Sequence, residues 1–332
     1  MNQAAIQSNL AHSNPVQNDI TQSNSLFFQD ALLGLSQQQK YLPSKYFYDV
    51  EGSRIFEEIC DLEEYYVTRT ELTILQKYKY EMASCFNNEL TVIEPGAGAG
   101  KKVSILLSAL NKPKRFIPIE ISSEALLMSS KHLQQKHPHL PVHPLQGDFT
   151  SQFDLQRVSK LLDKNENRMV FFPGSTLGNF SQIEALNILR NLKELAGKKG
   201  KILLGVDLIK DRKRLISAYD DKHGVTARFN LNLLVRMNKE LDSNFDVENG
   251  FTHKALFNER YSRIEMHLIS TRDQLVKLGS SRILFKKGES IHTENSHKYS
   301  VPLINSLVQK LGLNIENHWK DDNQDFGIFL LS

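Results

Sequence analysis

The chain has 332 residues, long enough for two domains or one enlarged one, and its 40% hydrophobic and 24% charged residues are ordinary for a globular protein with a large core. Its 41 Lys and Arg residues against 38 Asp and Glu give a net charge of +3, which argues against a dedicated nucleic-acid binder because phosphate contacts need a concentrated basic face. No apolar run approaches the length of a membrane span, and the two cysteines, Cys60 and Cys85, provide neither a disulfide framework nor a zinc site.

The first 26 residues form a polar arm that we expect to be disordered. They are rich in Asn, Gln and Ser, and Asp19 is their one charged residue. They lack the apolar centre of a secretory signal and the arginines of a mitochondrial presequence. From residue 27 onward the pattern becomes structured, and apolar residues recur at helical spacing over residues 53–61 and 69–86.

The middle of the chain alternates between short β-rich runs and helical segments. We predict strands over residues 90–94, 116–120, 142–146, 168–173 and 201–207, with helices over residues 102–110, 123–136 and 182–196. The strands are apolar on both faces, as buried parallel strands are. This alternation predicts an α/β fold with a doubly wound parallel sheet.

After residue 207 the alternation stops. Helical patterns over residues 212–220 and 225–241 precede β-like runs over residues 253–258, 263–270 and 281–285. The chain ends with a predicted helix over residues 301–311, a strand over 313–319, a turn over 321–324 and a strand over 326–331. We therefore expect an insertion of roughly 90 residues between the fifth strand and the last helix of the sheet domain.

A glycine-rich turn follows the first predicted strand, where residues 94–100 read EPGAGAG. Such a turn lets a ligand approach the backbone and meet the N–H groups of the next helix. A P-loop is excluded because Pro95 occupies the position of its first glycine. The dinucleotide fingerprint is excluded because Lys101 occupies the position of its last glycine. The pattern that fits, acidic-x-G-x-G-x-G, is the first motif of S-adenosylmethionine-dependent methyltransferases.

Two further strand ends support this cofactor. Glu120 ends the second strand, 22 residues after Gly98, where a carboxylate can accept hydrogen bonds from both ribose hydroxyls. Asp148 and Phe149 follow the third strand and offer an adenine an acidic acceptor and an aromatic face. The carboxyl ends of adjacent strands are where open α/β sheets bind their ligands.

Longer motifs occur in a fixed order from about residue 42 to the C-terminus. They read YFYD at 46–49, GSRIF at 52–56, EYYVTR at 64–69, GSTLGN at 174–179, DLIKD at 207–211, AYDD at 218–221, GVTARFN at 224–230, RIEM at 263–266, ENS at 294–296 and DFG at 325–327. In this order they resemble the L-histidine Nα-methyltransferases of ergothioneine biosynthesis. Glu120 departs from that family, which usually has Asp at the ribose position.

The resemblance implies a Rossmann-like class I methyltransferase sheet, with the last two predicted strands as its terminal hairpin. It also implies a second, α+β substrate domain built from the N-terminal segment and the insertion after strand five. We accordingly expect residues 27–70 and 210–298 to form the substrate-binding domain. Residues 71–209 and 299–332 would form the domain that binds S-adenosylmethionine.

The resemblance also assigns site residues. The implied cofactor contacts are Tyr48, Gly96, Lys102, Glu120, Asp148 and Phe149. Lys102 lies just inside a helix start, where the dipole disfavours a cation, and a cofactor carboxylate would explain it. No metal is expected, because the histidines match no ligand spacing.

The substrate contacts implied by the resemblance surround an amino acid. Tyr65, Asn179 and Tyr219 would hold its head group, Glu294 and Ser296 its imidazole, and Phe56, Gly174, Thr176 and Met266 would line the site. Asn179 and Tyr219 are the candidate catalytic residues, because amide and phenol groups orient an amine without keeping it protonated. Glu294 and Ser296 are two apart, so in an extended segment both lie on one face.

The expected reaction is methylation of the α-amino group of L-histidine, to Nα,Nα,Nα-trimethylhistidine, by a cytoplasmic monomer without a nucleic-acid or membrane partner. One alternative keeps the chemistry but takes a tryptophan-derived amino acid, although Glu294 and Ser296 argue against an indole. Another is a nucleic-acid methyltransferase, but the chain reads FPGST at 172–176 in place of an Asn/Asp-Pro-Pro-aromatic segment. The last is a non-catalytic binding protein on the same fold.

Overall fold

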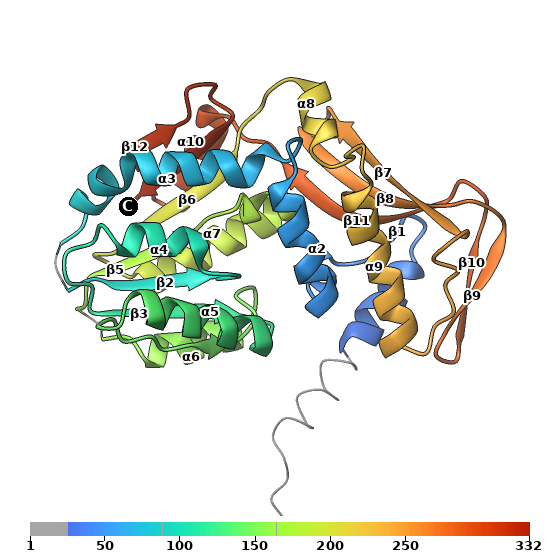
Figure 1. Cartoon of the computed structure of the whole chain (residues 1–332), viewed down its shortest axis with the longest axis horizontal. Helices are drawn as coiled ribbons and strands as arrows, with labels where there is room; N and C mark the ends of the chain where they lie inside the picture. Colours follow the sequence, from blue (N-terminus) through green and yellow to red (C-terminus); the bar gives the residue numbers. More distant parts are fainter. Residues whose placement is uncertain (1–25, 88, 164) are drawn as a thin grey trace, which may run out of the picture.

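The computed structural model describes residues 26–87, 89–163 and 165–332, so the predicted polar arm lies outside the described residues except for Leu26. Two main sheets, each with its own helices, lie side by side (Figure 1). No helix in these ranges is both long enough and apolar enough to span a membrane.

The larger sheet has seven strands in the order β12-β13-β6-β5-β2-β3-β4. Its strands are β2 (Thr91–Pro95), β3 (Arg115–Glu120), β4 (Leu145–Gln146), β5 (Arg168–Phe172), β6 (Lys201–Asp207), β12 (Ile315–Lys320) and β13 (Phe326–Leu331). β13 runs antiparallel to both of its neighbours, while β2 to β6 pair in parallel. This confirms the doubly wound sheet, and the strand order changes direction between β2 and β5.

Helices cover both faces of this sheet. They are α3 (Tyr66–Ser84), α4 (Lys101–Leu107), α5 (Ser123–Lys136), α6 (Gln152–Lys160), α7 (Gln182–Ala196) and α10 (Val301–Gln309). The bounds of α5 and α7 agree with the prediction because serine side chains cap both helices, Ser181 as part of a capping box with Glu184. α6 was not predicted.

Successive residues of the parallel strands pack into opposite layers. Phe171 of β5 belongs to the layer that includes residues of α3 and α4, and Val170 belongs to the layer that includes residues of α7 and α10. Both side chains are fully buried. The double-sided apolar pattern of the strands therefore has its expected cause, a helix layer on each face.

The smaller sheet has four strands in the order β1-β11-β8-β7. These are β1 (Lys40–Tyr41), β7 (Phe251–Asn258), β8 (Arg263–Ser270) and β11 (Ser290–His297). The adjoining helices are η1 (Ser44–Phe47), α2 (Val50–Asp61), α8 (Arg212–Ser217) and α9 (Val225–Glu240). A separate hairpin joins β9 (Gln274–Leu278) to β10 (Ser281–Phe285). β1 pairs in parallel with β11, so the N-terminal segment adds a strand to a sheet otherwise formed after residue 207. These contacts support the domain boundaries that we propose.

Candidate active site

The glycine-rich turn after β2 requires its glycines. Gly96, Gly98 and Gly100 have φ values of 70°, 49° and 70°, in the left-handed region that other residues rarely adopt. A Cβ on Gly98 would meet nothing within 4 Å, whereas one on Gly100 would lie 2.8 Å from the side chain of Leu133. The backbone at Gly98 therefore faces open space, as a ligand-binding turn must.

Glu120, at the end of β3, lies beside this turn. One carboxylate oxygen accepts hydrogen bonds from the backbone N–H groups of Ile121 (2.9 Å) and Ser122 (3.3 Å), and the other from that of Gly98 (3.2 Å). These backbone N–H groups hold the carboxylate in place, and its oxygens can still accept further hydrogen bonds from a ligand. Glu120 thus lies beside the glycine turn at the carboxyl end of the sheet, and its binding of the ribose hydroxyls stays a prediction.

Glu94 provides an independent test of whether a cofactor fits here. Its Oε2 is buried and has no hydrogen-bond partner among the described residues, and burial raises its pKa well above the ordinary value. A buried carboxyl oxygen without a partner needs a donor. The ammonium group and ribose hydroxyls of S-adenosylmethionine are donors, so the acceptors at Glu94 and Glu120 fit that cofactor. Glu94 was not predicted as a contact, although it is the acidic residue of the motif.

Phe149 lies against the same turn. Its ring would be 3.4 Å from a Cβ on Gly96, and it packs edge-on against Phe172, with ring centroids 5.4 Å apart. Asp148 accepts hydrogen bonds on Oδ1 from the backbone N–H (2.8 Å) and hydroxyl (2.6 Å) of Thr150. The structure thus brings both residues predicted for adenine to the carboxyl end of the sheet.

Lys102 has a protein partner that the sequence did not predict. Its ammonium pairs with the fully buried carboxylate of Glu71, at 2.7 Å, and this charge offsets the helix dipole. Glu71 also accepts hydrogen bonds from the backbone N–H of Gly174, at 2.9 and 3.0 Å. A Cβ on Gly174 would lie 3.3 Å from the Lys102 ammonium and 3.4 Å from the hydroxyl of Thr176. Predicted cofactor and substrate residues therefore meet here.

Four aromatic side chains meet on the substrate side, and we call them the aromatic cluster. Tyr48, Phe56, Tyr65 and Tyr219 contact one another in sequence, with edge-to-face ring centroids 5.7, 6.2 and 5.9 Å apart. The first three come from the N-terminal segment and Tyr219 from the turn after α8, so folding is needed to assemble them. All four were predicted.

The carboxylate of Glu294, on β11, lies near this cluster. It accepts no hydrogen bond and makes no ion pair with any residue that the structure describes, and burial raises its pKa to about 7 although Lys298 acts in the opposite direction. Burial also raises the pKa of the hydroxyls of Tyr48, Tyr65 and Tyr219, and Glu294 adds to the increase at each. Glu294 is thus a half-buried acceptor that the described chain leaves without a partner and that a ligand can satisfy.

Ser296 and Tyr219 form a hydrogen-bonded pair, with 2.7 Å between their hydroxyl oxygens. The buried ammonium of Lys298 donates to both, at 2.8 and 3.1 Å, and pairs with Asp207 at 2.7 Å. Lys298 and Asp207 were missed. The signal for Lys298 was present, because residues 294, 296 and 298 continue the alternation of an extended strand.

The remaining predicted residues lie around β11. Met266 is buried and pairs across the sheet with Glu294. Asn179 ends the 3₁₀ helix η2 (Thr176–Asn179), and its half-buried amide makes no hydrogen bond to the described chain. A Cβ on Gly178 would lie 2.9 Å from the carbonyl oxygen of His297, so glycine allows η2 to approach β11. Thr176 donates to the carbonyl of Pro173, at 2.9 Å.

Comparison with known proteins gives consistent matches over nearly the whole chain. A model of the family described as histidine-specific, S-adenosylmethionine-dependent methyltransferases matches residues 27–332. The chain is 35% identical over 306 residues to the histidine N-alpha-methyltransferase of Mycobacterium tuberculosis, covering 91% of this chain and 93% of that protein. The enzyme of the same name from Mycolicibacterium smegmatis is 34% identical, with the same coverage.

More distant matches include a fungal protein and a solved structure. Ergothioneine biosynthesis protein 1 of Neurospora crassa is 30% identical over 298 residues, which cover 88% of this chain and 33% of the fungal protein. A methyltransferase structure from Clostridium acetobutylicum, described as S-adenosylmethionine-dependent, is 10% identical, with a TM-score of 0.48 and coverage of 84% of this chain and 98% of that one.

Proposed function

Because the chain belongs to the family of histidine-specific, S-adenosylmethionine-dependent methyltransferases, we propose that it methylates the α-amino group of L-histidine. Three successive transfers would give Nα,Nα,Nα-trimethylhistidine (hercynine), through the mono- and dimethyl forms, as the first step of ergothioneine biosynthesis. The observation that carries the proposal is the half-buried carboxylate of Glu294, which lies near three tyrosine hydroxyls and accepts no hydrogen bond from the described chain.

S-adenosylmethionine supplies, when bound, an electrophilic methyl group on a sulfonium. We assign its ribose to Glu120, its adenine to Asp148 and Phe149, and its amino-acid end to the neighbourhood of Glu94 and Lys102. Tyr48 lies close to both the substrate site and the cofactor site. Burial is the main cause that raises the pKa of its hydroxyl, and the carboxylates of Glu294 and Glu120 raise it further. Tyr48 is therefore within reach of both the substrate and the cofactor.

Glu294 and Ser296 together complement a neutral imidazole. Lys298 donates to both hydroxyl oxygens of the Ser296–Tyr219 pair, and the two hydroxyls share one hydrogen between them. One hydroxyl hydrogen is therefore left to donate to a ligand, while Glu294 accepts. Neutral imidazole has one N–H and one lone pair, whereas Phe and Leu have neither and would leave Glu294 unpaired.

The α-amine must be neutral and held still for an in-line displacement. Asn179 and Tyr219 can hold it through an amide and a phenol, which add no negative charge that would keep the amine protonated. As methyl groups replace N–H donors, neutral contacts leave no charge unpaired, so the same residues serve all three transfers. The proton released at each step goes to solvent.

We also propose that the enzyme works as a monomer in the cytoplasm on small molecules alone. The cysteines Cys60 and Cys85 are unpaired, as expected in a reducing compartment, and the charge of +3 is small for a nucleic-acid binder.

A substrate panel tests the proposal. The purified full-length protein is incubated with S-adenosylmethionine and, separately, histidine, tryptophan or an RNA oligonucleotide, and methyl gain is measured by mass spectrometry. We expect gain on histidine alone. Preferential methylation of tryptophan would support the alternative substrate, methylated RNA a nucleic-acid enzyme, and no gain on any of them a binding protein.

A further inference from the structure

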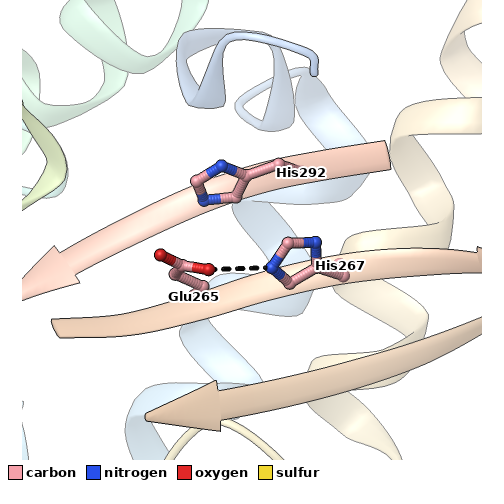
Figure 2. Close-up of side chains that lie close together, drawn as sticks. All are labelled: Glu265, His267 and His292. Atoms are coloured by element: carbon pink, nitrogen blue, oxygen red, sulfur yellow. Dashed lines mark hydrogen bonds and ion pairs between the residues drawn. The ribbon is translucent and has the colours of Figure 1, made fainter. Parts of the chain in front are cut away.

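The smaller sheet carries a second cluster of functional side chains, on the face opposite Glu294. Glu265 and His267 lie on β8, and His292 lies directly across from His267 on β11 (Figure 2). A register shift between His292 and Glu294 makes Glu294 pair with Met266. Although only two residues apart, His292 and Glu294 therefore lie on opposite faces, because directly opposed residues share a face.

These three side chains lie close together. Glu265, His267 and His292 each offer a ligand atom, and these atoms all lie within 4.8 Å of one another. Nε2 of His267 is 3.1 Å from Oε2 of Glu265, and the two imidazole rings stack with centroids 4.8 Å apart. Glu265 and His267 are buried and His292 is half-buried. We propose that Glu265, His267 and His292 bind one divalent transition-metal ion of the Zn²⁺ class.

The donor set favours this class of ion. Two imidazole nitrogens and one carboxylate oxygen suit Zn²⁺ and its neighbours, whereas Mg²⁺ and Ca²⁺ prefer oxygen ligands alone. Zn–N and Zn–O bonds of about 2.0–2.2 Å require ligand atoms somewhat over 3 Å apart, which the His267–Glu265 pair already meets. Because the two rings are stacked and an imidazole lone pair lies in the ring plane, the half-buried His292 ring turns out of the stack to complete the three ligands, and water fills the fourth position.

Hydrogen bonds around the cluster orient its ligands, as they do around metal sites. Arg263 and Asn258 donate to Oε1 of Glu265, at 2.6–2.8 Å, and leave Oε2 free to face His267. Nε2 of His292 lies 3.0 Å from the carbonyl oxygen of Glu294, and when it donates there Nδ1 keeps its lone pair for a metal. Nδ1 of His267 is buried without a partner among the described residues, so the ring proton can move to Nδ1 when a metal occupies Nε2.

The protonation states also suit metal binding. Burial lowers the pKa of His267 and lowers that of His292 to about 4, so both imidazoles are neutral near pH 7. Burial raises the pKa of Glu265, but hydrogen bonds from Arg263, His267 and Asn258 outweigh it and lower the pKa to about 2. The cluster can therefore take up a cation without losing a proton. The spacing of these residues along the chain predicted no metal, because strand pairing brings them together.

Zinc binding to the full-length protein tests the proposal without any methyltransferase assay. The protein is stripped with a chelator, and Zn²⁺ is added in a calorimeter and in thermal melts. We expect one site per chain, a rise in Tm with Zn²⁺, and at least tenfold weaker binding in Glu265→Gln and in His292→Asn. The exposed His143→Asn is the matched control, because it removes one imidazole elsewhere and should leave the site unchanged.

Both cluster variants are compared because Glu265 is more buried than His292, so that its substitution is expected to impair folding more. Circular dichroism verifies the fold of each variant. If Glu265→Gln does not fold, His292→Asn alone decides. The proposal is overturned if the wild-type protein binds no Zn²⁺ at 100 μM, if a folded cluster variant binds as the wild type does, or if His143→Asn loses the site equally.

Discussion

The carboxylate of Glu294 is half-buried, has a pKa raised to about 7, and lies near three tyrosine hydroxyls whose pKa values it raises. Hydrogen bonds that involve a charged group contribute about 1.5–3 kcal/mol. We therefore expect Glu294→Ala to raise the KM for histidine at least tenfold and to reduce discrimination against Phe and Leu. Glu294→Gln, which keeps an acceptor oxygen, should lose less. A folded Glu294→Ala enzyme with unchanged KM and selectivity would place imidazole recognition elsewhere.

Lys298 is fully buried and pairs with Asp207, which is equally buried. Removing one member of a buried pair typically costs roughly 3–5 kcal/mol, because the other charge stays uncompensated. We expect Lys298→Met to lower the free energy of unfolding by that order, measured by urea denaturation. Since Lys210 also contacts Asp207, the loss should fall at the low end. The double variant Lys298→Met/Asp207→Asn should recover part of it, and no recovery would show that the pair is not the cause.

Glu120 tests the cofactor assignment at a single position. Two ribose hydrogen bonds to a charged acceptor are worth a few kcal/mol, so Glu120→Ala should weaken S-adenosylmethionine binding roughly a hundredfold. Glu120→Asp, which keeps the charge, is the control and should weaken it much less. Isothermal titration measures both. Unchanged affinity in folded Glu120→Ala would remove Glu120 from the cofactor site.

β11 shows at the level of one element what the sequence could and could not predict. Its residues read SIHTENSH, without the apolar alternation that predicts a strand, yet they pair with β8 along most of its length. The prediction that Glu294 and Ser296 share a face required only that the chain between them be extended. The placement of His292 on the other face depends on a register shift, which no local pattern indicates.

The elements of the larger sheet were more predictable. β6, α5 and α7 have the predicted bounds because caps, turns and apolar periodicity act locally. Glu71 and Asp207 were missed because their importance comes from partners far away in the sequence, whereas the alternation of residues 294, 296 and 298 did offer a local signal for Lys298. α6 was missed although the side chain of Ser151 caps it, so here a local signal was overlooked.

β6 contains a glycine whose role is to make room. A Cβ on Gly205 would lie 2.2 Å from Oε1 of Glu71, a carboxylate held by both Lys102 and the backbone of Gly174. Overpacking of this kind costs about 1–3 kcal/mol, so we expect Gly205→Ala to reduce stability by that amount in urea denaturation. Adding Glu71→Asp, which shortens the side chain by one methylene, should relieve part of the loss. Equal stability of Gly205→Ala and the wild type would contradict the close packing.

On the scale of the whole molecule, the candidate site forms where the larger sheet and its helices meet the smaller sheet and its helices. An ion pair between Lys101 of α4 and Glu57 of α2 joins the end of the glycine turn to the segment that carries Phe56. One buried apolar cluster also continues from the larger sheet into the elements that adjoin the smaller sheet. The aromatic cluster and Glu294 therefore depend on segments from both ends of the chain, which explains why residue spacing alone gave only weak support for them.

The most direct test of the central claim is a mass-spectrometric time course of histidine with excess S-adenosylmethionine and the full-length protein, in which fragmentation locates each methyl group. We predict that mono- and dimethylhistidine appear first and pass into the trimethyl product, with every methyl on the α-nitrogen and none on the ring. The reason is that neutral holding groups such as Asn179 and Tyr219 tolerate each added methyl, while Glu294 and Ser296 occupy the ring nitrogens. A ring-methylated product, or a halt at monomethylhistidine with cofactor still present, would contradict the account.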